Sequence, residues 1–343
     1  MEQVVKAKNY IYTILKLDSE NNKLDIKIKN ELEEFSDFMM SLATPYNEDE
    51  KLQAFKNIFM VKYGSDALIP LTEVIDTDIG LGLPYNGYMA EAAEGGNSRH
   101  AYRKLNVIKG MLENKIMTAL RQGRSVVEIT DADIETIKAI DSEEMAKLNY
   151  ASSYSLNVFV TNADTGYEIY IGPNVGSAQA GNGISRFDSA LNTDFSQEMD
   201  EIYRREKLHH SEDYVIADVY EVSHYLRNTN LYSYKRQYDH NLYLGITEFE
   251  HNTSLNLNDL YLGHDPKKNQ MFIWSKSLQK RVKFITNSMY NVFSSNPVIR
   301  FLRSISATYE VSPIQNLFML QSMKYAYCPK IKFGYIVLSN EKW

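Results

Sequence analysis

The spacing of apolar residues changes along this chain, and that change limits the folds that the chain can adopt. Up to about residue 150, apolar residues mostly recur every three or four positions, which is the period of an amphipathic helix. From residue 153 they alternate, as in "SYSLNVFVTNADTGYEIYIG", where two runs flank "NADTG" and predict a hairpin. Helices followed by strands without regular alternation predict an α+β fold, with N-terminal helices and then a mixed, mainly antiparallel sheet region with packed helices.

The same pattern locates the individual elements. "IKNELEEFSDFMMSLA" (28–43) and "DEKLQAFKNIFMVKYG" (49–64) predict helices, and Gly64 is a suitable end for the second. A third helix is expected from Ser98 to Gly123, and Thr130 is expected to cap a short fourth. Further helices are predicted at 194–208 and 296–306, and strands at 214–222, 240–246, 255–264, 269–275, 280–286 and 330–339.

A glycine-rich stretch predicts a division of the chain near residue 98. Residues 1–98 are interpreted as a helical segment that ends in "GLGLPYNGYMAEAAEGGNS", which has no hydrophobic period and is expected to be mobile. Residues 99–343 are then the α+β part.

Composition excludes several classes of protein. The net charge of −7, concentrated in residues 1–98, argues against a general nucleic-acid binder but leaves room for a local basic surface further on. No run of 18 apolar residues and no N-terminal secretory signal is present, so no membrane span is predicted. A single cysteine, Cys328, excludes an internal disulfide framework and is consistent with a cytoplasmic location.

No metal or other cofactor is predicted from the histidines. Seven are scattered along the chain, and only His209 and His210 are close neighbours, beside Glu212 and Asp213. Because adjacent residues point apart on both a helix and a strand, this pair lacks the spacing of metal ligands.

The segment "YIGPNVGSAQAGNGISRFDS" (170–189) is the strongest candidate site. It lacks the Lys of a phosphate-binding Walker loop, and Arg186 replaces the third glycine of a dinucleotide fingerprint. Glycines such as Gly181 and Gly183 let backbone N–H groups approach an anion, and an arginine offers a two-pronged contact to carboxylate or phosphate. The alternative is a plain hairpin connection in which Arg186 pairs with a nearby carboxylate.

Two other segments carry cations, and each has a structural explanation as well as a functional one. The helix at 99–124 could follow a phosphate backbone or simply present a solvated basic face. In "SHYLRNTNLYSYKRQYDHNLYLG", tyrosines interleaved with Arg227, Lys235 and Arg236 could stack on single-stranded nucleic acid or serve as ordinary sheet residues. The basic residues of the helix are Arg99, Arg103, Lys104, Lys109, Lys115, Arg121 and Arg124.

Five segments, in this order, resemble one protein family, the lantibiotic dehydratases, over roughly residues 50–343. They are "FKNIFMVKYGSDALIPLTEVIDTDIGLGLPY", "GPNVGSAQAGNGISRFDSA", "LRNTNLYSYKRQYDHNLYLGI", "LNLNDLYLGHDPKKNQMFIWSKSLQKRVKFITNSMYN" and "CPKIKFGYIVLSNEKW". The glycine segment is similar to the family's glycine loop, on whose arginine Arg186 falls. Arg227, Asn230 and Arg236 match other polar positions of the family.

The resemblance implies an activity and its partners. Members of the family transfer glutamate from glutamyl-tRNA to Ser and Thr of a precursor peptide and then eliminate it, which leaves dehydroamino acids. This chain is similar to the later half of the glutamylation region, with the leader-binding domain upstream and the elimination domain after Trp343. Arg186 is the implied catalytic residue, and Gly181, Gly183, Arg227, Asn230 and Arg236 are implied to contact substrate or tRNA.

Three hypotheses follow from the resemblance. In the first, the chain contributes Arg186 and a tRNA-facing surface to glutamyl transfer. It is then inactive by itself, and separate chains supply the N-terminal and elimination segments. Alternatively, it is a non-catalytic scaffold or binding fragment that keeps the fold. The third hypothesis is a truncated gene product without a function of its own.

Overall fold

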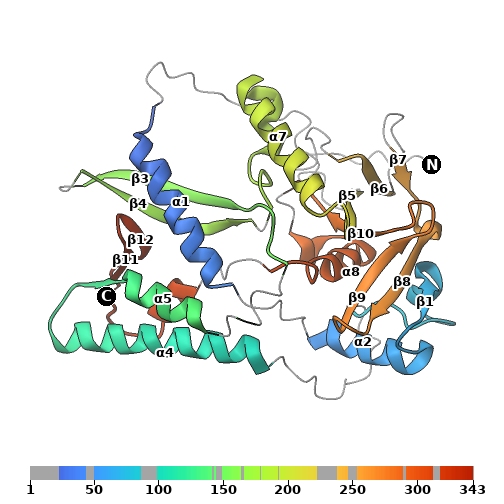
Figure 1. Ribbon diagram of the computed structural model, residues 1–343, viewed down its shortest axis with the longest axis horizontal. Coiled ribbons are helices and arrows are strands. Elements are labelled where there is room, and N and C mark those ends of the chain that lie inside the picture. The colour runs from blue at the N-terminus through green and yellow to red at the C-terminus, as the bar shows by residue number, and fades with distance from the viewer. Residues whose placement is uncertain are drawn as a thin grey trace, which may run out of the picture. The chain divides into compact units, whose positions relative to one another are not determined.

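The computed structural model groups the chain into two compact units. It describes residues 23–43, 50–85, 99–140, 143, 149–163, 166–177, 179–191, 193–221, 238–245, 253–288, 291–311 and 317–342 (Figure 1). Unit 1 comprises 1–18, 48–95 and 179–309, and unit 2 comprises 19–47, 96–178 and 310–343. Because the units interleave along the chain, they do not test the division predicted at residue 98.

Unit 1 is built on a seven-stranded mixed sheet. Its strand order is β1 (Leu68–Pro70), β8 (Leu260–Asp265), β9 (Gln270–Ser275), β10 (Lys280–Ile285), β5 (Tyr214–Glu221), β6 (His240–Leu244) and β7 (Thr253–Leu255). Pairing is antiparallel from β1 through β10 and parallel from β10 through β7. The carboxyl ends of β10, β5 and β6 therefore lie along one edge of the sheet.

Helices and short 3-10 turns complete unit 1. They are α2 (Glu50–Tyr63), α3 (Leu71–Ile75), η1 (Ser185–Ala190), α7 (Thr193–His209), η3 (Leu257–Asp259), η4 (Val292–Ser294) and α8 (Pro297–Ser306). Helix α8 packs on β9 and β10 (Figure 1), and its buried Phe301 meets Phe55 of α2 edge-on with ring centroids 4.9 Å apart. The aromatic contact joins two segments that are far apart in sequence.

Unit 2 contains a five-stranded mixed sheet. Its order is β2 (Val126–Glu128), β11 (Lys330–Phe333), β12 (Ile336–Ser339), β4 (Gly166–Ser177) and β3 (Ser155–Ala163). Its helices are α1 (Ile26–Ser41), α4 (Arg99–Arg121), α5 (Asp131–Ala139) and α9 (Leu317–Ser322). Phe38 of α1 stacks on Phe333 of β11 at 4.9 Å between ring centroids, so helix and sheet share one apolar core.

The α+β class with mixed sheets is confirmed, and so are most of the predicted elements. Helices occupy the predicted places at α1, α2, α4, α7 and α8, and Thr130 caps α5 with a capping box that includes Asp133. The hairpin predicted around "NADTG" is the antiparallel pair β3 and β4. Within the part of the chain that the structure describes, no helix combines the length and the apolar character needed to cross a membrane.

Two predicted strands were wrong in extent, for local reasons. The segment 255–264 is divided by η3, because the Asn256 side chain accepts a hydrogen bond from the Asn258 N–H at 2.9 Å and turns the backbone. The segment 330–339 is a hairpin rather than one strand: Gly334 adopts φ +54°, and Phe333 pairs with Ile336 across the turn.

Candidate functional site

The glycine segment lies at the carboxyl end of strand β10. Asn287, two residues beyond the last residue of β10, is hydrogen-bonded to Gln179 and Ser185 of the segment. The Gln179 side chain donates from Nε2 to Asn287 Oδ1 at 2.7 Å, and the Ser185 hydroxyl donates to the Asn287 main-chain oxygen. The carboxyl ends of parallel strands are where open sheets commonly bind ligands, so the segment occupies a suitable place for a site.

The loop is shorter than predicted. Strand β4 continues to Ser177, so Gly172 and Gly176 lie in a strand, and Gly176 pairs with Leu156 of β3. The extended pairing with β3 accounts for the difference, since its hydrogen bonds order the first half of "YIGPNVGSAQAGNGISRFDS". The turn that precedes Arg186 is therefore residues 179–184.

Gly181 and Gly183 differ in their surroundings. Gly181 has φ +83°, and a Cβ at this position would fall closer than 3.0 Å to Tyr203 Oη and Met199 Cε. A Cβ on Gly183 would meet no described atom within 4 Å. Glycine is thus required at 181 by its backbone conformation and by tight packing, whereas nothing in the described structure requires it at 183.

Arg186 is the second residue of η1 and is partly exposed. Its guanidinium carbon lies 4.3 Å from the centroid of the Phe187 ring, which is a cation–π distance. No carboxylate of the described residues lies within ion-pair distance of it. The neighbouring Asp188 instead accepts a hydrogen bond from the Ser196 hydroxyl at 2.6 Å. The Arg186 guanidinium, which has no ionic partner among the described residues, can therefore bind an anionic ligand.

A buried polar network supports the loop from below. Tyr238 donates to Glu206 Oε2 at 2.5 Å and accepts from Gln179 Nε2 at 3.1 Å, which links α7 to the loop. Burial, together with the Glu206 carboxylate, raises the pKa of Tyr238 well above its ordinary value, and the same two causes raise the pKa of Tyr203. Both phenols therefore stay protonated, and Tyr238 donates its proton to Glu206.

Two buried donors near the loop have no partner among the described residues. They are Asn287 Nδ2 and Tyr203 Oη, on side chains that are 0% and 2% exposed. Buried polar groups are nearly always hydrogen-bonded in folded proteins. Unpaired donors beside a glycine turn and an arginine favour an electron-rich ligand or ordered water at this place.

The three remaining predicted site residues are outside the part of the chain that the structure describes, and the histidine pair, for which no metal site was predicted, is in a structural contact. Arg227, Asn230 and Arg236, with the tyrosine-rich segment around them, lie outside the described residues. His210 stacks on Tyr214 with ring centroids 4.9 Å apart. Among the described residues, no group of three or more His, Cys, Asp or Glu side chains is arranged to hold a metal ion.

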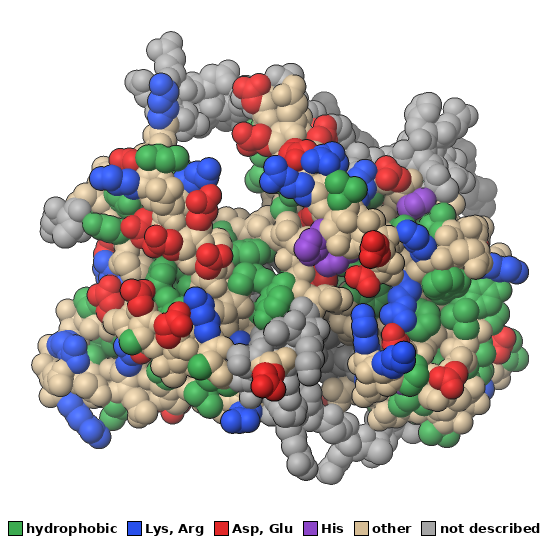
Figure 2. All heavy atoms as spheres, viewed as in Figure 1, with side chains coloured by type: hydrophobic (Ala, Val, Ile, Leu, Met, Phe, Trp, Pro, Cys, Tyr) green, Lys and Arg blue, Asp and Glu red, His purple; other side chains and the backbone are tan. Residues whose placement is uncertain are grey.

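The basic helix α4 does not present all its cations to solvent. Lys104 is buried and donates to the Ala43 carbonyl at 2.9 Å, and Lys115 pairs with Asp133 at 2.6 Å. Arg121 and Arg124 are exposed. On the face in Figure 2, Lys and Arg side chains are interspersed with Asp and Glu. These contacts favour the structural explanation for part of the helix.

Sequence reasoning did not find Gln179, Asn287 or Tyr203. One signal could have drawn attention to Asn287: it comes two residues after the strand "KRVKFI", and the carboxyl end of a parallel strand is expected to carry site residues. Gln179 and Tyr203 have no comparable local signal.

Fold and site together define an α+β protein with an arginine-bearing turn at the carboxyl edge of parallel strands. The chain belongs to the lantibiotic dehydratase family, because the family model described as "Lantibiotic dehydratase, N terminus" matches residues 1–343. That match extends the resemblance seen in the sequence over the first 49 residues as well.

Individual relatives are distant and much longer. The chain is 24% identical over 355 residues to the epidermin biosynthesis protein EpiB of Staphylococcus epidermidis, and 27% identical over 362 residues to the nisin biosynthesis protein NisB of Lactococcus lactis subsp. lactis. Each alignment covers 100% of this chain and 33% of the relative. The chain therefore spans about one third of the length of these curated relatives.

Solved structures share the fold. The crystal structure of the tRNA-dependent lantibiotic dehydratase MibB from Microbispora sp. 107891 superposes with a TM-score of 0.70 and 20% identity, over 92% of this chain and 30% of that one. The glutamylation domain TbtB from thiomuracin biosynthesis superposes with a TM-score of 0.50 and 16% identity, over 91% and 37%. A second structure of TbtB is bound to 5′-phosphodesmethylglutamycin.

Proposed function

We propose that this chain is part of the glutamylation machinery of a lantibiotic dehydratase. It acts with glutamyl-tRNA on Ser and Thr of a ribosomal precursor peptide, as a step toward dehydroamino acids. The observation that carries the proposal is the place of Arg186, next to a turn that is hydrogen-bonded to Asn287 at the carboxyl edge of parallel strands. Arg186 forms no ion pair with a described carboxylate. The similar fold of MibB, a tRNA-dependent lantibiotic dehydratase, and of the TbtB glutamylation domain supports it.

The proposed reaction is a transesterification. The peptide hydroxyl oxygen forms a bond to the glutamyl carbonyl carbon, the ester bond to the tRNA ribose oxygen breaks, and the hydroxyl proton goes to that ribose oxygen. Negative charge develops on the carbonyl oxygen or is already present on the glutamate carboxylate and on phosphates. The Arg186 guanidinium stabilises one of these anions, and Gly181 lets the turn form against Tyr203.

The location and the accessory residues belong to the same proposal. Because aminoacyl-tRNA is a cytoplasmic co-substrate, the reaction takes place in the cytoplasm. Gly183, Arg227, Asn230 and Arg236 are proposed to line the substrate or tRNA site, and no cofactor is needed.

The test is binding of labelled glutamyl-tRNA at a series of salt concentrations. Arg186→Ala should weaken binding and flatten the slope of log K against log salt by roughly one unit, because one phosphate contact and its counterion release are lost. Arg205→Ala is the matched control, since Arg205 is an exposed arginine of the same unit that pairs with Glu201. Binding that Arg186→Ala leaves unchanged contradicts the proposal.

A non-catalytic scaffold is the second candidate, and the observation that favours it is the cation–π contact of Arg186 with the Phe187 ring, which accounts for the place of this side chain without a ligand. Peptide dehydration by this chain mixed with the remaining family segments separates the two candidates. Activity that disappears in Arg186→Ala supports the catalytic role. Activity that Arg186→Ala leaves intact supports the scaffold.

A further inference from the structure

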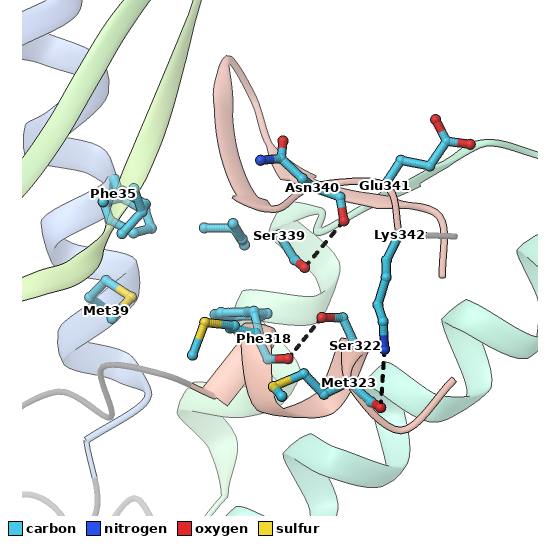
Figure 3. Close-up of a pocket in the computed structure, with 13 residues that line it drawn as sticks. Phe35, Met39, Phe318, Ser322, Met323, Ser339, Asn340, Glu341 and Lys342 are labelled. Carbon is cyan, nitrogen blue, oxygen red and sulfur yellow. Dashed lines mark hydrogen bonds between the residues drawn. The ribbon is translucent and has the colours of Figure 1, made fainter. Parts of the chain in front are cut away.

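Unit 2 contains a pocket of about 440 Å³ with an apolar floor (Figure 3). Phe35 and Met39 of α1 and Phe318 of α9 form the floor and are themselves buried. Leu338 of β12 and Ile171 of β4 close it on the sheet side. The volume lies in the range of sites that bind ligands.

The pocket opens where two parallel strands separate. Strands β4 and β12 pair at Ile336 with Ile169 and at Val337 with Tyr170, and the described register stops there. The following residues of both strands, Leu338 and Ser339 on one side and Ile171 and Gly172 on the other, line the pocket. Strand residues that are no longer paired on one side present main-chain N–H and C=O groups that another strand can bind.

The outer wall is apolar and adaptable. Met319 lies in α9 and Met323 in the turn after it. They line the pocket and are 41% and 61% exposed, respectively. Unbranched thioether side chains rearrange readily around different partners. The helix end itself is fixed, because Ser322 donates to the Met319 carbonyl and Lys342 donates to the Met323 carbonyl (Figure 3). Lys342 also donates to the Tyr325 carbonyl.

We propose that this pocket binds an extended polypeptide segment with a bulky apolar side chain. The main chain of the segment continues the sheet where β4 and β12 are no longer paired, at Ile171 and Leu338, and its apolar side chain enters the space beside Phe35 and Phe318. The combination of an open strand end with an apolar cavity fits a peptide, because a peptide alone supplies both a hydrogen-bonding backbone and spaced side chains. Met319 and Met323 close over that side chain.

This site is independent of the proposed function. It belongs to unit 2, whereas Arg186 belongs to unit 1, and its test uses neither tRNA nor catalysis. Failure of one proposal therefore leaves the other intact.

The experiment measures the fluorescence anisotropy of end-blocked, fluorescein-labelled hexapeptides titrated with the whole chain. The probe is Gly-Leu-Ser-Leu-Ser-Gly, with a matched peptide in which Ser replaces both Leu and a third in which the central amides are N-methylated. The leucine peptide should bind, and each matched peptide should bind about tenfold more weakly or worse.

Two variants of the chain locate the site. Met319→Glu should weaken the leucine peptide about tenfold, whereas Leu320→Glu should not. Leu320 is an exposed neighbour on α9, at 59%, that does not line the pocket. Circular dichroism melting curves establish that both variants fold.

Several outcomes overturn the proposal. One is no binding of the leucine peptide to the folded chain at millimolar concentration, and another is equal binding of all three peptides. Equal loss in both variants overturns it as well. A dimer of the chain that Met319→Glu alone disperses would assign the pocket to a second copy and would also overturn it.

Discussion

Gln179 and Asn287 lie 108 positions apart in the sequence and are joined by a hydrogen bond of 2.7 Å between Nε2 and Oδ1. Because the Ser185 hydroxyl also binds the Asn287 main-chain oxygen, a single residue after β10 fixes both ends of the arginine-bearing turn. The place of Arg186 therefore depends on a residue from a distant part of the chain.

The first prediction follows from this link. Asn287→Ala removes the acceptor for Gln179 and should lower the free energy of unfolding by about 1–3 kcal/mol, because buried polar groups lose their partners. It should also weaken glutamyl-tRNA binding without changing the salt slope, since no charge is removed, whereas Arg186→Ala should flatten the slope. Urea unfolding and the salt series measure these effects, and Asn258→Ala, at an exposed position of η3, is the control. An unchanged affinity for Asn287→Ala would contradict the link.

The second prediction contrasts two glycines of the turn. Gly181→Ala should cost roughly 1–3 kcal/mol for a side chain at φ +83°, with an added cost from overlap with Tyr203 and Met199. Gly183→Ala should change stability by less than about 0.5 kcal/mol, because its surroundings are open. Thermal unfolding compares the two. Tyr203→Phe removes one overlapping atom, so the double variant Gly181→Ala with Tyr203→Phe should be more stable than the sum of the single effects.

The third prediction concerns acid stability. Hydrogen bonds from Tyr170, Lys332 and Lys330 lower the pKa of the Glu168 carboxyl from 4.5 to about 2. A lowered folded-state pKa adds stability that is present above pH 4.5 and is lost as the pH falls toward 2. The free energy of unfolding of the wild type should therefore exceed that of Glu168→Gln by about 1–3 kcal/mol at pH 7. This difference, measured by urea unfolding at a series of pH values, should shrink between pH 4.5 and pH 2.

Glu201→Gln is the control for the acid measurement. Arg204 and Arg205 also lower the pKa of the Glu201 carboxyl to about 2, but this ion pair is on the surface and is screened by water. Glu201→Gln should lower the free energy of unfolding clearly less than Glu168→Gln does, as measured by urea unfolding at the same pH values. Equal effects of the two variants would show that exposure does not decide the contribution.

The fourth prediction addresses the basic helix. If α4 presents a solvated face, the double variant Arg121→Ala with Arg124→Ala should change glutamyl-tRNA affinity by less than about twofold. Binding of labelled glutamyl-tRNA to this double variant, at the salt concentrations used for Arg186→Ala, measures the affinity and its salt slope. A slope flattened by roughly two units would instead assign both arginines to a phosphate contact.

The sequence was informative where structure depends on local pattern. The helix faces of α1 and α8, the capping box at Thr130 and the β3–β4 hairpin all depend on residues within a few positions of one another. Two strands were predicted too long because a single Asn256 or Gly334 turns the backbone within an otherwise apolar run.

The candidate site could be predicted only in part. Arg186 and its glycines are visible as a local pattern, whereas the residues that hold them come from elsewhere. Asn287 and Tyr203 reach the turn through the packing of β10 and α7, and no local period reports such a contact. The network of Tyr238 with Glu206 depends on the same packing.

The strand order of unit 2 has a consequence for synthesis on the ribosome. Strands β11 and β12 follow the other strands of unit 2 in sequence, yet they occupy the middle of the sheet between β2 and β4. Until residues 330–339 leave the exit tunnel, β2 and β4 have no neighbour on their inner sides, and the first-made helices have an unfinished surface to cover. Nascent unit 2 must therefore wait for its final segment, with strand edges open to chaperones and to aggregation in the meantime.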